Sequence, residues 1–410
     1  MTRVHESRGW GLLGVVLGAI ALVFAALAAA IALDPGPAST APLRARLSVA
    51  GALGADRADG FARALVPRPF SFPADHGPHP PFRTEWWYWT GNLRTVGGDD
   101  AGARRFGFQL TFFRTALAAA VGARDSAWGT RDVYLAHLAL TDVESGRFHA
   151  RERWARGALD LAGATARPFH VWLGDWAAEG QTPDGFPVRL RAGEGDLRID
   201  LTLAAGKPLV LHGEGGLSRK SAEPGNASYY YSLTRMPAAG EVRIGGRAYR
   251  TEGAAWMDRE WSTSALGPDV LGWDWFALQL GDGRELMLYR LRRRDGSADP
   301  ASQGTLVAAD GTSRGLDRDA AEVLILGHWN SPRGGTRYPA RWRIRVPAAG
   351  LDLVVTPLVP DQELDLAVRY WEGAVLVDGT ADGRPLGGAG YVELVGYEVG
   401  AGRAAEAVRQ

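Results

Sequence analysis

The chain has 410 residues, 46% of them hydrophobic, and carries no net charge at pH 7. It is too long for one ordinary domain, and its neutrality gives no sign of a nucleic-acid partner. The complete absence of cysteine excludes thiolate catalysis, disulfides and zinc sites built on cysteine. Lysine occurs only at Lys207 and Lys220, which leaves little room for Schiff-base chemistry.

Near the N-terminus, the run from Trp10 to Leu33 contains no charged residue and follows Arg3 and Arg8. As a helix it would span about 36 Å at ~1.5 Å per residue, and the hydrocarbon core of a membrane is ~30 Å thick. We therefore predict a transmembrane helix within residues 1–33 that anchors the protein in a membrane.

This segment would place the rest of the chain outside the cytoplasm. The expected location is the bacterial inner membrane, with a single N-terminal anchor and the folded part in the periplasm. The alternative is a cleaved signal peptide ending near the small residues Ala28 to Ala30, which would give a secreted protein. Residues 34–67 are rich in Pro, Ala, Gly and Arg and are predicted to form a linker.

From residue 83 onward, short runs are rich in aromatic and β-branched residues, as in strands. The runs end at Gly-rich turns, and the chain holds 54 glycines. The expected strands include 83–93, 105–114, 132–141, 147–154, 169–177, 187–203, 209–213, 228–235 and 241–250. Many short strands with few helical stretches predict an all-β sandwich or barrel.

Two halves of the chain open and close alike. Glu85-Trp-Trp-Tyr-Trp and its return run Phe106-Gly-Phe-Gln-Leu resemble Gly272-Trp-Asp-Trp-Phe and Glu285-Leu-Met-Leu-Tyr. The closing run Gly253-Ala-Ala-Trp-Met-Asp258 resembles Gly388-Ala-Gly-Tyr-Val-Glu393. We therefore predict two copies of one antiparallel β-barrel fold, over residues 68–261 and 262–403, followed by a tail at 404–410.

The stretch from Gly253 to Phe276 joins these two halves and combines large aromatic residues with acids. Its tryptophans are Trp256, Trp261, Trp273 and Trp275, and its acids are Asp258, Glu260 and Asp274. Strand alternation would give an aromatic wall that has ionisable groups set into it, which is typical of a pocket rather than a plain core.

Asp258 is the first catalytic candidate, as a general acid. It shares a strand face with Trp256, and a carboxylic acid beside aromatic side chains has a raised pKa and can donate a proton near neutral pH. The alternative is a structural ion pair, with Arg259 or with another arginine of this arginine-rich chain.

Glu260 is the second candidate, because it lies two residues further along the same face, about 6.7 Å away at ~3.3 Å per residue. That separation would also suit an inverting glycoside hydrolase, in which ~6.5–9.5 Å between two carboxyl groups leaves room for water. Alternatively, Glu260 faces solvent and has no catalytic role.

Histidines provide two weaker candidates. His137 lies in an alternating strand and could serve as a base or hydrogen-bond donor inside a barrel, or as an ordinary core histidine. Asp75, His76 and His79 have the chemistry of metal ligands. Their Pro-rich loop lacks helical ligand spacing, however, so we predict no metal site there and expect the loop to cap a barrel.

The chain lacks a Gly-x-Ser-x-Gly elbow, a His-Glu-x-x-His motif, a Walker loop and a dinucleotide-binding Gly-x-Gly-x-x-Gly motif. Several of its motifs instead resemble those of the CrtC/AttH-type lipocalin-like family, whose "predicted secreted hydrolase" branch is the closer one. They include Phe72-Pro-Ala-Asp-His-Gly-Pro-His, Thr84-Glu-Trp-Trp-Tyr-Trp-Thr-Gly-Asn-Leu, Ala136-His-Leu-Ala-Leu-Thr-Asp, Trp172-Leu-Gly-Asp-Trp and Ala255-Trp-Met-Asp-Arg-Glu-Trp-Ser-Thr. The resemblance covers residues 60–400 and implies two consecutive lipocalin-like β-barrels with a ligand site between them.

The same resemblance implies a function without a cofactor. One branch of the family contains carotenoid 1,2-hydratases, which add water to an isoprenoid double bond, and this points to Asp258 as the proton donor. Arg259 stands where the junction motif of fungal relatives carries His. The implied ligand is an isoprenoid or another long apolar chain, bound by aromatic side chains around the junction. The ligand-binding candidates are Trp86, Trp87, Trp89, Trp256, Trp261, Trp273, Asp274 and Trp275.

A second hypothesis is a non-catalytic carrier that shelters a lipid between its barrels. Members of the closer branch tend to sit beside lipoprotein-release-type transport permeases, so an ABC transporter permease is an expected partner. A catalyst requires Asp258 to be buried toward a cavity with a raised pKa, whereas a carrier requires only the aromatic wall.

Overall fold

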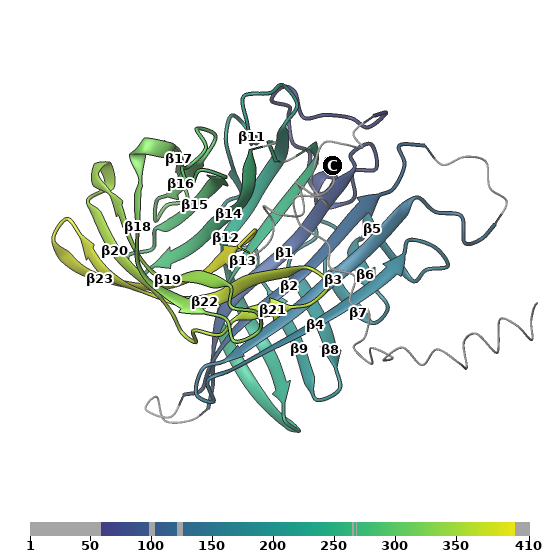
Figure 1. The fold of residues 1–410 in the computed structure, drawn as a ribbon. Coiled ribbons are helices and arrows are strands. Elements are labelled where there is room, and N and C mark those ends of the chain that lie inside the picture. Colours follow the sequence, from purple (N-terminus) through teal and green to yellow (C-terminus); the bar gives the residue numbers. More distant parts are fainter. Residues whose placement is uncertain (1–58, 98–102, 121–125, 265, 268, 398–410) are drawn as a thin grey trace, which may run out of the picture. The chain divides into compact units, whose positions relative to one another are not determined.

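The computed structural model describes residues 59–97, 103–120, 126–264, 266–267 and 269–397. These residues form two large antiparallel β-sheets (Figure 1). The short helices are confined to the 3-10 turns η2 (Ala74–His76), η4 (Arg318–Ala320) and η5 (Pro347–Ala349) within the described ranges. The all-β class predicted from strand alternation is therefore confirmed.

The first sheet has 13 strands, coloured purple to teal in Figure 1. They are β1 (Thr84–Thr95), β2 (Arg105–Ala116), β3 (Asp132–Asp142), β4 (Arg147–Arg156), β5 (Ala162–Ala166), β6 (Phe169–Leu173), β7 (Trp176–Gly180), β8 (Val188–Glu194), β9 (Leu197–Leu203), β10 (Val210–Leu211), β11 (Leu217–Arg219), β12 (Ala227–Ile244) and β13 (Arg247–Ser264). Its order is β4-β3-β2-β1-β13-β12-β9-β8-β7-β6-β5, and β10 and β11 pair with β12.

The second sheet has 10 strands, coloured green to yellow. They are β14 (Val270–Leu280), β15 (Glu285–Arg293), β16 (Gln303–Val307), β17 (Ser313–Asp317), β18 (Glu322–Asn330), β19 (Arg337–Val346), β20 (Leu351–Pro357), β21 (Glu363–Asp365), β22 (Arg369–Ala381) and β23 (Arg384–Leu394). Its order is β17-β16-β15-β14-β23-β22-β20-β19-β18, and β21 pairs with β22.

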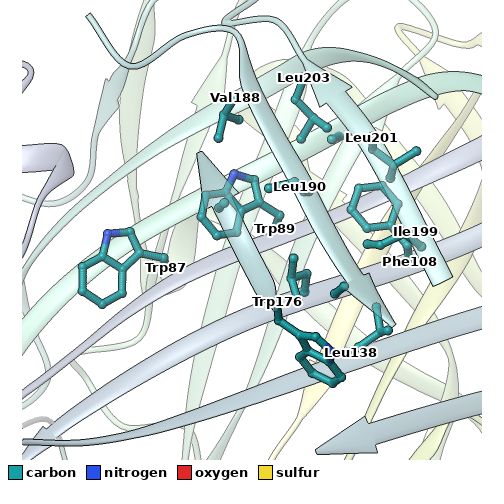
Figure 2. Packing of buried hydrophobic residues seen from close by; sticks show 14 of the residues in the cluster. Trp87, Trp89, Phe108, Leu138, Trp176, Val188, Leu190, Ile199, Leu201 and Leu203 are labelled. Atoms are coloured by element: carbon teal, nitrogen blue, oxygen red, sulfur yellow. The ribbon is translucent and has the colours of Figure 1, made fainter. Parts of the chain in front are cut away.

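The first sheet curls until it is nearly a barrel. Although β6 lies close to one end of the strand order, it contacts β2, β3 and β4 near the other end. The enclosed face carries a large apolar core, in which Trp87, Trp89 and Trp176 are fully buried among aliphatic side chains (Figure 2). This burial of apolar surface is the main force that holds the curled sheet together.

The two sheets share one pairing pattern. In the first sheet the opening strand β1 pairs with β2 and with the closing strand β13. In the second sheet β14 likewise pairs with β15 and with the closing strand β23. The two opening and two closing motifs that resemble each other in sequence thus occupy matching places.

Four expected strand runs differ from the structure. The run 169–177 divides into β6 and β7, and the run 187–203 divides into β8 and β9, because a turn interrupts each of them. The runs 228–235 and 241–250 also have other bounds. Strand β12 runs without interruption from Ala227 to Ile244 and turns at Gly245-Gly246 into β13. The cause is a bulge between Leu233 and Met236, which shifts the register and keeps the strand continuous past Pro237. Strand β13 continues to Ser264, beyond the expected domain boundary at 261/262.

The outer faces of the two sheets pack against each other. Their contact is a third apolar cluster that includes Tyr88 and Trp256 of the first sheet and Trp275 and Tyr391 of the second. Because neighbouring residues of a strand point to opposite faces, these side chains are the ones that do not enter the two enclosed cores. The joining stretch of the sequence is therefore central to the contact.

No helix in the described part of the chain is long and apolar enough to cross a membrane. The anchor expected within residues 1–33 lies outside the described residues, as does the tail at 404–410.

Candidate functional site

A cavity of about 370 Å³ lies where the outer faces of the two sheets meet. From the first sheet and the segments before and within it, its lining includes Arg83, Thr84, Glu85, Trp86, Tyr88, Thr111, Phe113, Arg114, Leu117, Leu135, His137, Trp154, Lys220, Tyr230, Asp258 and Glu260. From the second sheet and its flanks, it includes Leu266, Trp273, Trp275, Tyr289, Leu291, Val368, Tyr370, Glu372, Glu393 and Val395.

Strand register orders the first-sheet wall into two rows. A polar row consists of Asp258, Tyr88, Thr111 and His137, which are successive cross-strand partners on β13, β1, β2 and β3. An apolar row lies two residues away and consists of Trp86, Phe113, Leu135 and Trp154. The polar row contacts the second sheet, because His137 Nδ1 lies 2.7 Å from the Tyr370 hydroxyl and Tyr88 donates to Glu372.

Asp258 is almost fully buried and faces this cavity. Its carboxyl accepts hydrogen bonds from Tyr230 Oη at 2.6 Å, from Trp256 Nε1 at 2.6 Å and from Ser232 Oγ. Burial raises the pKa of Asp258 from 3.8 to about 7, although these three hydrogen bonds act to lower it. A carboxyl group in this state can hold a proton near neutral pH.

The ion pair considered for Asp258 does not form. Arg259 points to the opposite face of β13, where it bonds to Glu85 and lies 4.0 Å over the Trp87 ring. Among the described residues, no lysine, arginine or histidine forms a salt bridge with Asp258.

A chain of hydrogen bonds continues from Asp258 into the protein. Ser232 Oγ lies 2.6 Å from His212 Nε2, and His212 Nδ1 lies 2.8 Å from Thr305 Oγ1. Burial lowers the pKa of His212 to about 3, so the imidazole is neutral. A neutral imidazole between two hydroxyl groups can exchange tautomers as Ser232 switches between donor and acceptor. The sequence reasoning missed His212 because its partners Ser232 and Thr305 are distant from it along the chain.

Glu260 also lines the cavity and does not face solvent. Its carboxyl is held by the Lys220 ammonium at 3.2 Å and by a hydrogen bond from Ser228. Lys220 lies 4.1 Å from the centre of the Tyr289 ring. Glu260 therefore already has a cationic partner within the protein.

Two further acids, Glu372 and Glu393, come from the second sheet and were missed. They are direct cross-strand partners on β22 and β23. Glu372 is fully buried, and Glu393 is partly exposed because it faces the cavity. Removal from bulk water raises the pKa of Glu393 from 4.5 to about 8, and the nearby Asp258 adds to the effect. The internal repeat could have identified Glu393, because Glu393 occupies the position in the second half that Asp258 occupies in the first half.

His137 lines the cavity and connects the sheets. In addition to its contact with Tyr370, its Nε2 lies 3.1 Å from a carboxyl oxygen of Glu152. Both ring nitrogens are thus occupied by protein partners.

The predicted aromatic wall separates into two groups by strand parity. Trp86, Trp273 and Trp275 line the cavity, and Trp256 lies just behind it as a donor to Asp258. The remaining candidates do not line it. Trp87 and Trp89 point into the enclosed core (Figure 2), Trp261 stacks on His79 at 3.7 Å, and Asp274 bonds to Arg292 and Tyr397.

The loop with Asp75, His76 and His79 serves packing. His79 bridges Asp75 and Glu85, and His76 Nδ1 lies 2.6 Å from the Tyr231 hydroxyl. In the ranges that the structure describes, no group of three His, Asp or Glu residues is placed to hold a metal ion.

The apolar row runs beside the polar row and ends at the protein surface on β4. At its far end, the Trp154 side chain is 44% exposed, and the neighbouring cavity residue Leu117 is 61% exposed. A cavity that has acids in its lining and an exposed apolar rim can hold a chain longer than itself.

Comparison with known proteins identifies the family. The AttH-like family model matches residues 63–397. The crystal structure of a protein from Nitrosomonas europaea assigned as an AttH is 36% identical, with a TM-score of 0.72, and the match covers 82% of this chain and 100% of that one. The crystal structure of kievitone hydratase from Nectria haematococca is 15% identical, with a TM-score of 0.62, and the match covers 84% and 98%. No curated protein matches the chain. The chain belongs to the AttH-like family.

Proposed function

We propose that this protein is a cofactor-free acid catalyst, a hydratase or isomerase, which acts on a long apolar ligand held between the two sheets. The observation that carries the proposal is Asp258, a buried carboxyl group that faces an aromatic cavity and has no cationic partner among the described residues. Its raised pKa keeps a proton available near neutral pH, as general acid catalysis requires.

The proposed reaction begins at a carbon–carbon double bond of the ligand. The O–H bond of Asp258 breaks, its proton forms a new C–H bond, and the adjacent carbon becomes a carbocation. The faces of Trp86, Trp273 and Trp275 could stabilise this positive charge. Attack by water, which then loses a proton to the Asp258 carboxylate, gives hydration. Loss of a neighbouring C–H proton to the same carboxylate gives isomerisation.

The cavity also favours a long ligand such as an isoprenoid chain. The acids lie beside the contact between the sheets, whereas Leu117 and Trp154 form an apolar rim open to solvent. If the reactive end of the ligand lies at the acids, the rest of its hydrocarbon chain would lie along the apolar row, because burial of apolar surface favours that position. The hydratase named among the structures of the same fold is consistent with this chemistry, but the cavity acid is what supports it.

Within this proposal, the two sheets are two successive lipocalin-like barrels, over residues 68–261 and 262–403, that share one site. Residues 1–33 would tether them to the bacterial inner membrane on its periplasmic side. An apolar rim close to a membrane would allow a ligand to pass from lipid into the cavity.

The second candidate is a lipid carrier without catalysis, in which an ABC transporter permease would receive the ligand. The exposed rim favours this function, since binding requires the apolar row and not a proton donor. A glycoside hydrolase is less well supported, because Glu260 is bound to Lys220 and the wall is mostly apolar.

A direct test begins with mass spectrometry of lipid that co-purifies with the full chain. The bound lipid and a panel of neutral polyenes and isoprenoids are then incubated with the protein in ¹⁸O-labelled water. We expect gain of labelled water or a shifted double bond. Asp258→Asn should abolish turnover and retain binding. Asp274→Asn changes a buried acid of β14 that does not line the cavity, so this variant should retain turnover if it folds. Unchanged turnover in Asp258→Asn would overturn the proposal, and bound lipid without turnover would favour the carrier.

A further inference from the structure

We propose that Glu372 and Glu393 form a cation-binding subsite, which receives the positively charged centre of an otherwise apolar ligand. This inference rests on the proposed function, because the charge would be the carbocation formed after proton transfer. It also defines the ligand class: neutral chains that become cationic, and ammonium amphiphiles that mimic them, but not fatty acids or other anions.

The first argument is the register of the second sheet. Glu372 and Glu393 are direct partners on β22 and β23, and such partners have Cβ atoms about 4.5–5.5 Å apart. Two carboxylates this close repel each other unless a proton or another cation lies between them. The pair is thus arranged to take up one positive charge.

The second argument is that the described residues supply no cation to the pair. Within the described ranges, neither Glu372 nor Glu393 forms a salt bridge. Three basic groups of the lining have other partners: Lys220 is bound to Glu260, Arg114 is bound to Glu85 and Asp132, and His137 contacts Glu152.

The third argument is an unsatisfied atom. Glu372 is fully buried, its Oε1 accepts a hydrogen bond from Tyr88, and the Tyr370 hydroxyl also interacts with this carboxyl group. Its Oε2 nevertheless has no hydrogen bond of ordinary geometry in the described part of the chain. A buried carboxyl oxygen normally has a partner, since leaving it unpaired is costly. Glu372 is among the residues that line the cavity, so a positive charge held there would lie close to its carboxyl group.

Glu363 is a buried acid of the same sheet whose role is structural, and it serves as a comparison for Glu372 and Glu393. Glu363 of β21 is buried in the same sheet, and its two oxygens are satisfied by Ser331, Arg333 and Tyr338. It does not line the cavity. Glu363 is therefore a matched control for Glu372 and Glu393.

The aromatic side chains around the pair suit a cation as well. Trp275 is the cross-strand partner of Glu393 on the other side, and Tyr289 is the partner of Trp275. Trp273 and Tyr88 also line the cavity. Aromatic faces attract cations such as alkylammonium groups, most strongly where water is excluded.

Cation binding at the pair would compete with a proton, so affinity should depend on pH. The titratable or charged groups that face the pair from the surrounding elements are Tyr88 on β1, Asp258 and Glu260 on β13, Tyr370 on β22, Tyr391 on β23 and, further away, Glu152 on β4 and Lys220. Removal from water raises the pKa of Glu393 to about 8, so a bound cation would displace a proton near neutral pH.

The test measures binding of three probes of equal chain length to the full chain by calorimetry: octyltrimethylammonium, 1-octanol and octanoate. We expect the ammonium probe to bind at least about tenfold more tightly than octanoate. Its affinity should rise between about pH 6 and pH 9, while that of octanol stays constant. Glu393→Gln and Glu372→Gln should each weaken ammonium binding by about tenfold, whereas Glu363→Gln should leave it unchanged.

Equal affinity for the ammonium and octanoate probes would overturn the inference, as would an equal loss in Glu363→Gln. If Glu372→Gln does not fold, Glu393→Gln and the pH series decide the result. Asp258→Asn separates this inference from the proposed function, because it should abolish turnover and keep ammonium affinity within about threefold. If Asp258→Asn loses turnover but the protein shows no preference for the ammonium probe over octanoate, the cation subsite is contradicted and the proposed function is not.

Discussion

The hydroxyl group of Tyr88 donates a hydrogen bond to the Glu372 carboxyl, and the two residues belong to different sheets. Within its own sheet, Tyr88 is the cross-strand partner of Asp258. One side chain therefore connects the acid of the first sheet with the acid pair of the second, and changes at this contact should affect both sheets.

Tyr88→Phe should lower the free energy of unfolding by about 1–3 kcal/mol, because it leaves a buried carboxyl group without its donor. Chemical denaturation measures the effect. Tyr134→Phe is the control, since Tyr134 is also buried in the first sheet and its hydroxyl makes no hydrogen bond to another described residue. Equal stability of Tyr88→Phe and the wild type would contradict the role given to this contact.

Stability should fall as the pH rises from about 6.5 to about 8. Asp258 and Glu393 have folded-state pKa values raised to about 7 and about 8, so the folded protein holds these protons more tightly than the unfolded chain. Their stabilising contribution is complete below the unfolded pKa and is lost as the pH passes the folded pKa. The slope is at most about 1.4 kcal/mol per pH unit for each group.

The buried histidines should not contribute to this dependence of the free energy of unfolding on pH. Burial lowers the pKa values of His76 to about 4 and of His212 to about 3, so their effect on stability is confined to pH values below about 6.5. Denaturation at a series of pH values should show a smaller slope in Glu393→Gln than in the wild type. Parallel curves for the two proteins would show that Glu393 does not titrate in this range.

Ser232→Ala should raise the pKa of Asp258 further, by about one to two pH units, since it removes a hydrogen bond to the ionised carboxyl. The carbonyl infrared band of protonated, isotope-labelled aspartate can follow this titration. Ser218→Ala is a suitable comparison, because Ser218 is equally buried but contacts the Tyr289 hydroxyl instead of an acid. A shift of the same size in both variants would argue against a direct effect.

Arg259→Leu should cost about 3–5 kcal/mol of stability, because it removes a fully buried guanidinium that is bound to Glu85 and stacked over Trp87. The exposed pair of Arg191 and Glu179 offers a contrast. Arg191→Leu should cost less than about 1 kcal/mol, since solvent screens that pair. Similar losses measured by denaturation would show that Arg259 has no special structural role.

Gly107→Ala should disturb the contact between the sheets. A Cβ atom at Gly107 of β2 would lie 2.4 Å from the Cβ atom of Ala374 of β22, which is closer than real contacts allow. We expect a loss of about 1–3 kcal/mol and weaker binding of octyltrimethylammonium, because the cavity depends on how closely the sheets approach. Gly315→Ala on β17 meets no neighbouring atom and should be neutral in both measurements.

Several properties followed from local pattern alone. Aromatic and β-branched runs between Gly-rich turns predicted an all-β protein, and the period of 2 indicated that Trp86 and Trp87 face opposite sides of β1. The same period placed Asp258 and Glu260 on one face of β13. These inferences succeeded because side-chain direction along a strand depends only on neighbouring residues.

The assembly of the candidate site was decided by the tertiary structure. Glu372 and Glu393 lie side by side through strand pairing, Lys220 reaches Glu260, and His212 joins the hydrogen bonds of Asp258. No local pattern along the chain specifies which of these residues come into contact. The pKa of a carboxyl group also depends on how far packing removes it from water. Sequence therefore identified Asp258 as a candidate acid, and only the fold showed that no arginine, lysine or histidine of the described ranges pairs with it.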